Sequence, residues 1–169
     1  MAERSRRYTH APDGCECPFC EVAVRRDRPG EGTRQADVVL SESRAMAFVA
    51  SRWWPRNPGH VLVVPTRHYE NLYDLPDVYG AAIHSVARRV AWAMKAAYGC
   101  EGVSTRQHNE PAGQQDVWHH HLHVLPRYAG DGLYASPGEA TTAAARAPYA
   151  AALRRALAAG PGASVGEPW

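Results

Sequence analysis

The segment 118–127 constrains this chain more than any other, because four histidines fall within five residues and Pro-Arg closes the run. His119, His121 and His123 occupy every second position. Successive side chains of a β-strand point to opposite faces, so a strand here would place these imidazoles on one face, roughly 7 Å apart. Its other face would receive Trp118, His120, Leu122 and Val124.

Such a row of imidazoles suits a site that binds metal, polarises a phosphate or supplies a nitrogen nucleophile near neutral pH. A polar strand or a metal-binding tract is the alternative. The aromatic and aliphatic residues of the opposite face favour a buried functional site. Strand alternation removes His120 from that site, and nothing in the nearby sequence gives a role to His84 or His10.

Composition narrows the class of protein. A chain of 169 residues is expected to form one domain. Its formal net charge of +2 calls for neither a nucleic-acid nor a membrane partner. No run approaches the roughly 18 apolar residues of a membrane span, and the polar N-terminus does not resemble a signal peptide, so we expect a cytoplasmic protein. In that reducing compartment the four cysteines are expected as metal ligands or free thiols, with Cys100 as a small packed residue.

The order of elements predicts an α+β domain around an antiparallel sheet. We expect tails over 1–14 and 160–169, a domain over 15–159, a short helix near 18–26 and a flexible stretch over 28–32. Strands are expected over 37–41, 46–50, 60–65 and 103–107, before the histidine strand. Apolar residues at three- and four-residue spacing predict a long helix capped by Asp74 and ending near residue 98. A final helix is expected over 143–158, or from Pro148 onward.

Two segments carry a family resemblance: 57–68 (Asn-Pro-Gly-His-Val-Leu-Val-Val-Pro-Thr-Arg-His) and 115–124 (Gln-Asp-Val-Trp-His-His-His-Leu-His-Val). With about 60 residues and a helix between them, they resemble the histidine triad (HIT) superfamily, and the similarity runs from about Cys17 to Arg127. The resemblance implies a HIT-like antiparallel meander with one long helix and a C-terminal helix. It also implies a homodimer.

The resemblance further implies an enzyme that acts at the α-phosphorus of a nucleotide. The middle histidine, His121, would attack and form a covalent nucleotidyl intermediate, which divides one displacement into two easier steps. His123 would contact the phosphoryl oxygens or the leaving group, and His60 would complete the cluster. Further phosphate donors are expected at Gln115, Asp116 and Val117, through their backbone amides, and at His108 or Asn109.

Cys17-Pro18-Phe19-Cys20 is a Cys-x-x-Cys pair, which supplies half of a tetrahedral zinc site. In branches of the superfamily that carry this pair, the resemblance implies His68 and His119 as the other ligands. Four protein ligands would make the zinc structural. The alternatives are a redox thiol pair, for which no βαβ context exists, and a further ligand at Cys15.

For the base, the resemblance implies an apolar pocket from Phe19, Val22 and Phe48, although the same residues suit a core. Trp53 and Trp54 suit base stacking, a dimer face or the core. The chain departs from purine-binding branches because no acidic residue lies between Phe48 and His60; the polar residues there include Ser51, Arg52, Arg56 and Asn57. Ribose recognition is therefore left open, and Arg52 or Arg56 would favour a longer anionic tail, as in a dinucleoside polyphosphate.

The sequence thus predicts a zinc-stabilised nucleotide hydrolase or nucleotidyltransferase acting on nucleoside phosphoramidates or dinucleoside polyphosphates. The alternatives are a nucleotide-binding regulatory module with incidental turnover and a metal-storing histidine tract.

Overall fold

The computed structural model describes residues 8–27 and 32–160. In chain order the helices and strands are α2 (Pro18–Ala23), η2 (Gln35–Asp37), β1 (Val38–Ser41), β2 (Ala45–Val49), β3 (Arg52–Trp53), β4 (Val61–Pro65), α3 (Asp77–Tyr98), β5 (Gly102–Gln107), η3 (Pro111–Gly113), β6 (Leu122–Arg127), β7 (Glu139–Ala140) and α4 (Ala143–Ala159). The expected α+β class, with one long and one C-terminal helix, is confirmed.

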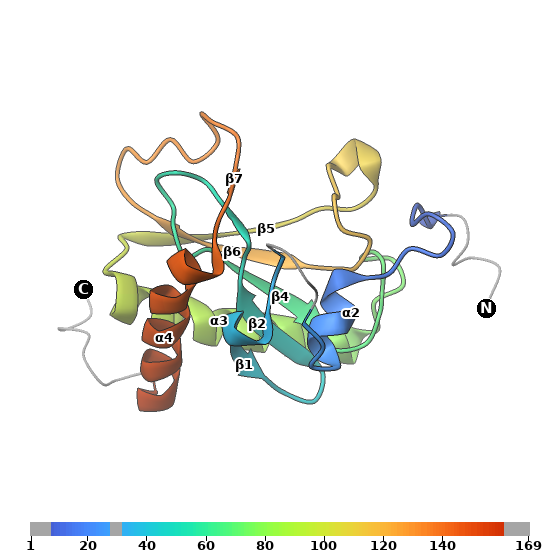
Figure 1. Ribbon diagram of the computed structural model, residues 1–169, viewed down its shortest axis with the longest axis horizontal. Helices are drawn as coiled ribbons and strands as arrows, with labels where there is room; N and C mark the ends of the chain where they lie inside the picture. Colours follow the sequence, from blue (N-terminus) through green and yellow to red (C-terminus); the bar gives the residue numbers. More distant parts are fainter. Residues whose placement is uncertain (1–7, 28–31, 161–169) are drawn as a thin grey trace.

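Five strands form one antiparallel sheet in the order β1-β2-β4-β6-β5 (Figure 1). Every residue of β2 and β4 is buried, as expected for central strands rich in valine and alanine. β6 lies between β4 and β5, with Leu62 and Arg106 as its cross-strand neighbours at His123. The topology therefore brings residues from three distant segments to one place.

The long helix α3 packs across β2, β4 and β6 with the predicted apolar face, which includes Ile83, Val86, Val90 and Met94. Gly99 ends it in the left-handed conformation, at φ 62°. The expected cap at Asp74 is wrong, because the helix begins at Asp77 with Pro76 as its N-cap. A residue before proline is disfavoured in the helical region, so Leu75 separates Asp74 from the helix.

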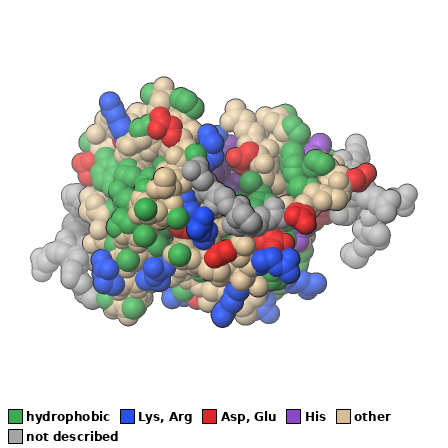
Figure 2. All heavy atoms as spheres, in the orientation of Figure 1, with side chains coloured by type: hydrophobic (Ala, Val, Ile, Leu, Met, Phe, Trp, Pro, Cys, Tyr) green, Lys and Arg blue, Asp and Glu red, His purple; other side chains and the backbone are tan. Residues whose placement is uncertain are grey.

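Two groups of loops rise from the sheet on the side away from α3. One contains the small β3–β7 sheet, and the other contains η3 (yellow in Figure 1). The space-filling view shows a hollow between them in which histidine side chains are visible (Figure 2).

Part of the expected N-terminal tail is described and contacts the domain. The backbone N–H of His10 donates to Glu70 Oε1 at 2.6 Å, and the carbonyl of Tyr8 accepts from Asn71 at 3.1 Å. Residues 1–7 and 161–169, and the stretch 28–31, lie outside the described residues, so the tail and domain boundaries stay predictions. Within the described ranges no helix is long and apolar enough to cross a membrane.

A buried ion pair holds the helix α4 to η2, directly before β1. Arg146 Nε lies 2.9 Å from Asp37 Oδ1, and both side chains are almost fully buried. The same guanidinium donates to the carbonyls of Thr141 at 2.7 Å and Gly32 at 3.0 Å. Thr142 caps the helix through Ala145 N–H, so α4 begins at Ala143, with Pro148 inside it.

We predict that Arg146→Met lowers the free energy of unfolding by about 3–5 kcal/mol, because it leaves the Asp37 carboxylate buried without its charge partner. Denaturant unfolding measures the loss. Arg155→Met, at an exposed position of the same helix, is the matched control and should change the free energy of unfolding by less than about 0.5 kcal/mol. Equal effects of the two variants would contradict this assignment.

A second ion pair anchors the loop that follows β6. Both carboxylate oxygens of Asp131 accept from Arg127, at 2.7 and 2.8 Å, and Asn57 Nδ2 donates to it at 2.8 Å. The backbone N–H groups of Tyr128 and Leu133 also donate to this carboxylate. The Arg127 guanidinium therefore holds the pKa of Asp131 well below its usual value of 3.8.

Because the pKa of Asp131 is lowered on folding, its ionised form stabilises the protein above about pH 4, and this stability is lost as pH falls through the lowered value. We predict that Asp131→Asn destabilises the protein at pH 7 and that its difference from wild type shrinks below about pH 4. Thermal unfolding across pH measures this. Asp13→Asn, at an exposed position, is the control and should leave the melting temperature at pH 7 near that of wild type. A stability difference between Asp131→Asn and wild type that stays constant with pH would refute the prediction.

Candidate active site and metal centre

The histidine segment is only partly a strand. β6 begins at Leu122, so the strand predicted for 118–124 is wrong in its first half. In place of ladder bonds, His119 N–H donates to Val117 O at 2.8 Å and His120 N–H to Tyr69 O at 2.6 Å. The pairing of β6 with β4 and with β5 stops at Leu122, which leaves the preceding residues free to bend.

Despite this bend, His120 points away from His119, His121 and His123. The rings of His121 and His123 lie 5.0 Å apart, and His119 turns toward the two cysteines. His120 lines a different cavity, against Ile83 and His84. The structure therefore divides the histidines as expected, although a local bend and not strand parity does so at the first three positions.

His121 is held in one protonation form. Its side chain is buried, and Nδ1 lies 2.7 Å from the carbonyl oxygen of His119. A carbonyl only accepts, so Nδ1 carries the proton and Nε2 keeps its lone pair. Burial also lowers the pKa of His121, which keeps the ring neutral. Nε2 lies 3.6 Å from the exposed carboxylate of Asp116.

His60 and His123 form an oriented pair. Their rings stack 5.0 Å apart, and His60 Nε2 lies 2.9 Å from His123 Nδ1. His60 Nδ1 donates to the carbonyl of Arg52 at 3.1 Å, so His60 Nε2 accepts the proton of His123. Burial lowers the pKa of His60 to about 4 and that of His123 further. His108 packs edge-on against His123 at 5.7 Å.

The backbone N–H of Gln115, which was predicted as a phosphate donor, donates to the Glu110 carbonyl oxygen at 3.1 Å. The side chains of Gln115 and Asn109 are hydrogen-bonded as well. Gln115 donates to the carbonyls of Glu70 and Val117, at 2.6 and 3.0 Å, and accepts from the Glu110 N–H at 2.9 Å. Asn109 accepts from the Leu72 N–H at 2.8 Å and pairs with Gln107. Both side chains therefore hold the loops around the histidines in place.

The predicted base-pocket residues lie together beside the histidines. Phe19 packs 5.2 Å from Phe48 and 5.6 Å from His121, and these phenylalanines and Val22 are all buried. Trp53 is buried edge-on against Tyr149 and belongs to the core. Trp54 is half-buried and lies 5.7 Å from His60.

Each of the two arginines that the sequence singled out donates to a backbone carbonyl. Arg52 donates to Gly138 O at 2.7 Å and Arg56 to Gly130 O at 3.1 Å. The cation beside the histidines is Arg106, which sequence reasoning missed. Only the β5–β6 register, which places it opposite His123, reveals it.

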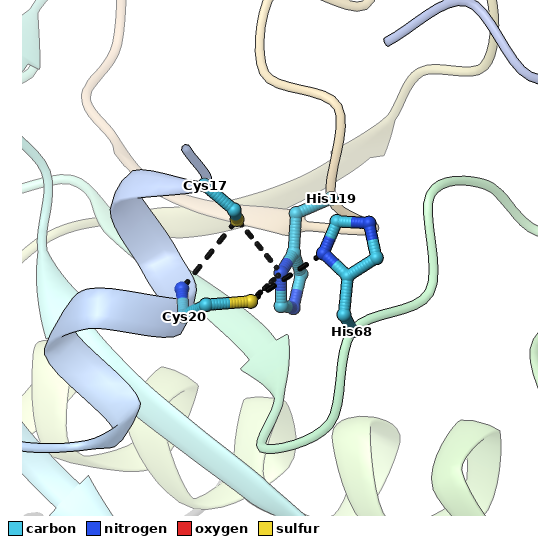
Figure 3. Close-up of side chains that lie close together, drawn as sticks. All are labelled: Cys17, Cys20, His68 and His119. Atoms are coloured by element: carbon cyan, nitrogen blue, oxygen red, sulfur yellow. Dashed lines mark hydrogen bonds between the residues drawn. The ribbon is translucent and has the colours of Figure 1, made fainter. Parts of the chain in front are cut away.

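Cys17, Cys20, His68 and His119 come together as the resemblance implied (Figure 3). Their ligand atoms all lie within 4.8 Å of one another. Cys17 Sγ lies 3.2 Å from His119 Nδ1, and Cys20 Sγ lies 3.4 Å from His68 Nδ1 and 3.6 Å from His119 Nδ1. Tetrahedral zinc with bonds of about 2.0 Å to nitrogen and 2.3 Å to sulfur holds its ligand atoms about 3.3–3.8 Å apart. The four side chains therefore fit a zinc ion.

Two further observations favour metal binding. His119 Nε2 donates to Pro65 O at 3.1 Å, which leaves Nδ1 deprotonated and facing the cysteines. Burial opposes a charged Cys17, but its contacts with the His119 and His68 rings outweigh burial and lower the pKa of Cys17 to about 5. Burial and the neighbouring Cys17 raise the pKa of Cys20 to about 12, as expected for two sulfurs that share one site. Cys15 is exposed and outside the group.

We predict that Cys17→Ser abolishes stoichiometric zinc in protein purified without chelator and lowers the melting temperature by about 10 °C. This is the shift expected from losing about 4 kcal/mol of ligand stabilisation. Metal analysis and thermal unfolding test both. Cys15→Ser is the matched control and should retain zinc. Zinc retained by Cys17→Ser would exclude this ligand set.

The chain is similar to known proteins in both sequence and fold. Residues 31–130 match the HIT domain family. An uncharacterised HIT-like protein of Methanocaldococcus jannaschii is 32% identical over 73% of this chain and 88% of its own length. The crystal structure of a Zn-bound histidine triad family protein from Mycobacterium smegmatis superposes with a TM-score of 0.70 at 28% identity, over 85% of this chain and 94% of the other.

Two relatives carry named activities. Adenylylsulfatase HINT3 of Arabidopsis thaliana is 33% identical over 72% of this chain and 57% of its own length. An AP-4-A phosphorylase of Mycobacterium tuberculosis is 28% identical over 68% of this chain and 55% of its own length. This chain thus spans little more than half of either enzyme.

Proposed function

Because the chain belongs to the HIT family, we propose that it is a nucleotide hydrolase or nucleotidyltransferase in which His121 attacks the α-phosphorus. The observation that carries the proposal is the buried, neutral His121, whose Nδ1–H is bound to the His119 carbonyl. The named activities of the two relatives, an adenylylsulfatase and an AP-4-A phosphorylase, support a nucleotide substrate.

In the first step the lone pair of His121 Nε2 forms a bond to the α-phosphorus, and the bond from phosphorus to the leaving group breaks. The leaving group departs with that electron pair. In the second step water or another acceptor attacks the same phosphorus and loses its proton to solvent. The bond to Nε2 breaks, its electron pair returns to the nitrogen, and the neutral imidazole is restored. Two such displacements each have a lower barrier than one attack by water.

The neighbouring side chains define the roles that support these steps. His123 and His60 are the groups proposed to meet the phosphoryl oxygens or the leaving group, with His108 beside them. Asp116 would move from His121 Nε2 when the anionic phosphate enters, because like charges repel and the exposed contact at 3.6 Å is weak. Phe19, Val22 and Phe48 are proposed to bound the base.

We propose that zinc, held by Cys17, Cys20, His68 and His119, is structural, because four protein ligands leave no open position for substrate. His119 would serve two purposes: its side chain would bind zinc, and its carbonyl accepts from His121. The homodimer also remains a proposal. β5 is an edge strand of the sheet, and Trp92 on α3 is 50% exposed, as a dimer face would require.

We predict that His121→Ala lowers kcat on adenosine 5′-phosphoramidate and on diadenosine polyphosphates by more than about 10⁴-fold, as loss of a nucleophile does elsewhere. Mass spectrometry of wild type quenched during turnover should detect a nucleotidyl adduct that the variant lacks. His120→Gln, one residue away on a different cavity, is the matched control and should keep activity. Tight nucleotide binding without His121-dependent turnover would instead identify a regulatory module.

A further inference from the structure

Near His121, five side chains lie in a ring in which each is next to the following one: Arg106, His123, His60, Trp54 and Tyr134. Arg106 lies opposite His123 across β5 and β6, and His123 stacks on His60. Trp54 lies 5.7 Å from His60 and 5.8 Å from Tyr134, and the Arg106 guanidinium lies 4.8 Å over the Tyr134 ring. We refer to Trp54, Tyr134 and Arg106 as the aromatic–arginine wall.

The wall lies at one end of the candidate site. Phe19 contacts His121 and His119. The wall instead contacts His60 and His123. The order along the site is therefore an apolar group, the attacking histidine, the His60–His123 pair and then the wall. A substrate held by its base near Phe19 and by its α-phosphorus at His121 would direct its remaining part toward the wall.

The wall is accessible and firmly held. Tyr134 is 54% exposed, and Trp54 and Arg106 are half-buried, so parts of all three side chains are open to a ligand. Arg106 is fixed by Gln114 Oε1 at 3.1 Å as well as by Tyr134. The loop that carries Tyr134 is anchored by the Asp131–Arg127 ion pair. Trp54 also lines a cavity of about 240 Å³, together with Arg56 and Leu133.

The chemistry of the wall suits an aromatic, anionic group. Aromatic side chains stack on nucleic-acid bases of any kind. The guanidinium of Arg106 is a fixed positive charge with several donors for phosphate oxygens. Arg52 and Arg56 bind backbone carbonyls, whereas Arg106 borders the histidines directly. The wall therefore offers stacking surface and a phosphate partner together.

We propose that the aromatic–arginine wall is a specificity-determining subsite for the leaving group. It would bind a leaving group that consists of further phosphates joined to an aromatic ring. This rests on the proposed attack by His121. As the bond from the α-phosphorus to the bridging oxygen breaks, the electron pair and negative charge pass to the departing phosphate, beside Arg106. Its ring stacks on Trp54 and Tyr134.

The test compares two substrates that share an adenylyl group but differ in the leaving group: diadenosine tetraphosphate and adenosine 5′-phosphoramidate. We expect Trp54→Ala, Tyr134→Ala and Arg106→Ala each to lower kcat/KM for diadenosine tetraphosphate by about tenfold or more, which corresponds to 1.4 kcal/mol. The kcat/KM for the phosphoramidate, whose leaving group is small, should stay within about twofold of the wild-type value. Arg88→Ala, at an exposed position of α3, is the control and should keep the wild-type kcat/KM for both substrates.

Equal losses on both substrates, or no loss on either, would overturn the subsite. A binding measurement makes the test independent of turnover and of folding defects. In the His121→Ala background, adding Trp54→Ala or Tyr134→Ala should lower the affinity for diadenosine tetraphosphate about tenfold and leave the affinity for AMP unchanged. Equal weakening of both ligands would also overturn it. If the wild-type protein turns over neither substrate, the proposed function itself is wrong. If the wall variants lose kcat/KM for diadenosine tetraphosphate alone, both the proposed function and the subsite are supported.

Discussion

One hydrogen bond links the main parts of this molecule, that from His121 Nδ1 to the carbonyl oxygen of His119. The His119 ring belongs to the Cys₂His₂ group, and its far nitrogen donates to Pro65 at the end of β4. A single residue thus joins the N-terminal helix, the central sheet and the candidate reacting nitrogen. Any change that moves His119 must alter the metal group and the tautomer of His121 together.

The bend before β6 makes this arrangement possible. In a regular strand the carbonyl of His119 would be available to a neighbouring strand. Because the ladder begins at Leu122, that carbonyl instead accepts from the side chain two residues ahead. Local irregularity at a functional position is common, since a reacting side chain requires a direction that regular structure does not provide.

Short-range patterns predicted the parts of the fold that short-range physics controls. Apolar spacing identified α3, a continuous apolar run identified β4, and the family resemblance supplied the four zinc ligands. Three features escaped because they depend on distant partners or exact backbone paths: the late start of β6, the displaced cap at Asp74, and the place of Arg106. Arg106 has no local signal, since only its register against His123 brings it to the site.

The direction of the hydrogen bonds in the His60–His123 pair has a chemical consequence. The proton on His123 Nδ1 is committed to His60, and that on His60 is committed to the Arg52 carbonyl. Because burial lowers both pKa values, both rings are neutral at neutral pH, and the pair holds no spare proton to give to a leaving group. The site then selects substrates by the basicity of the leaving atom. A weakly basic oxyanion can leave without a proton, whereas a strongly basic amine must already be protonated when it leaves.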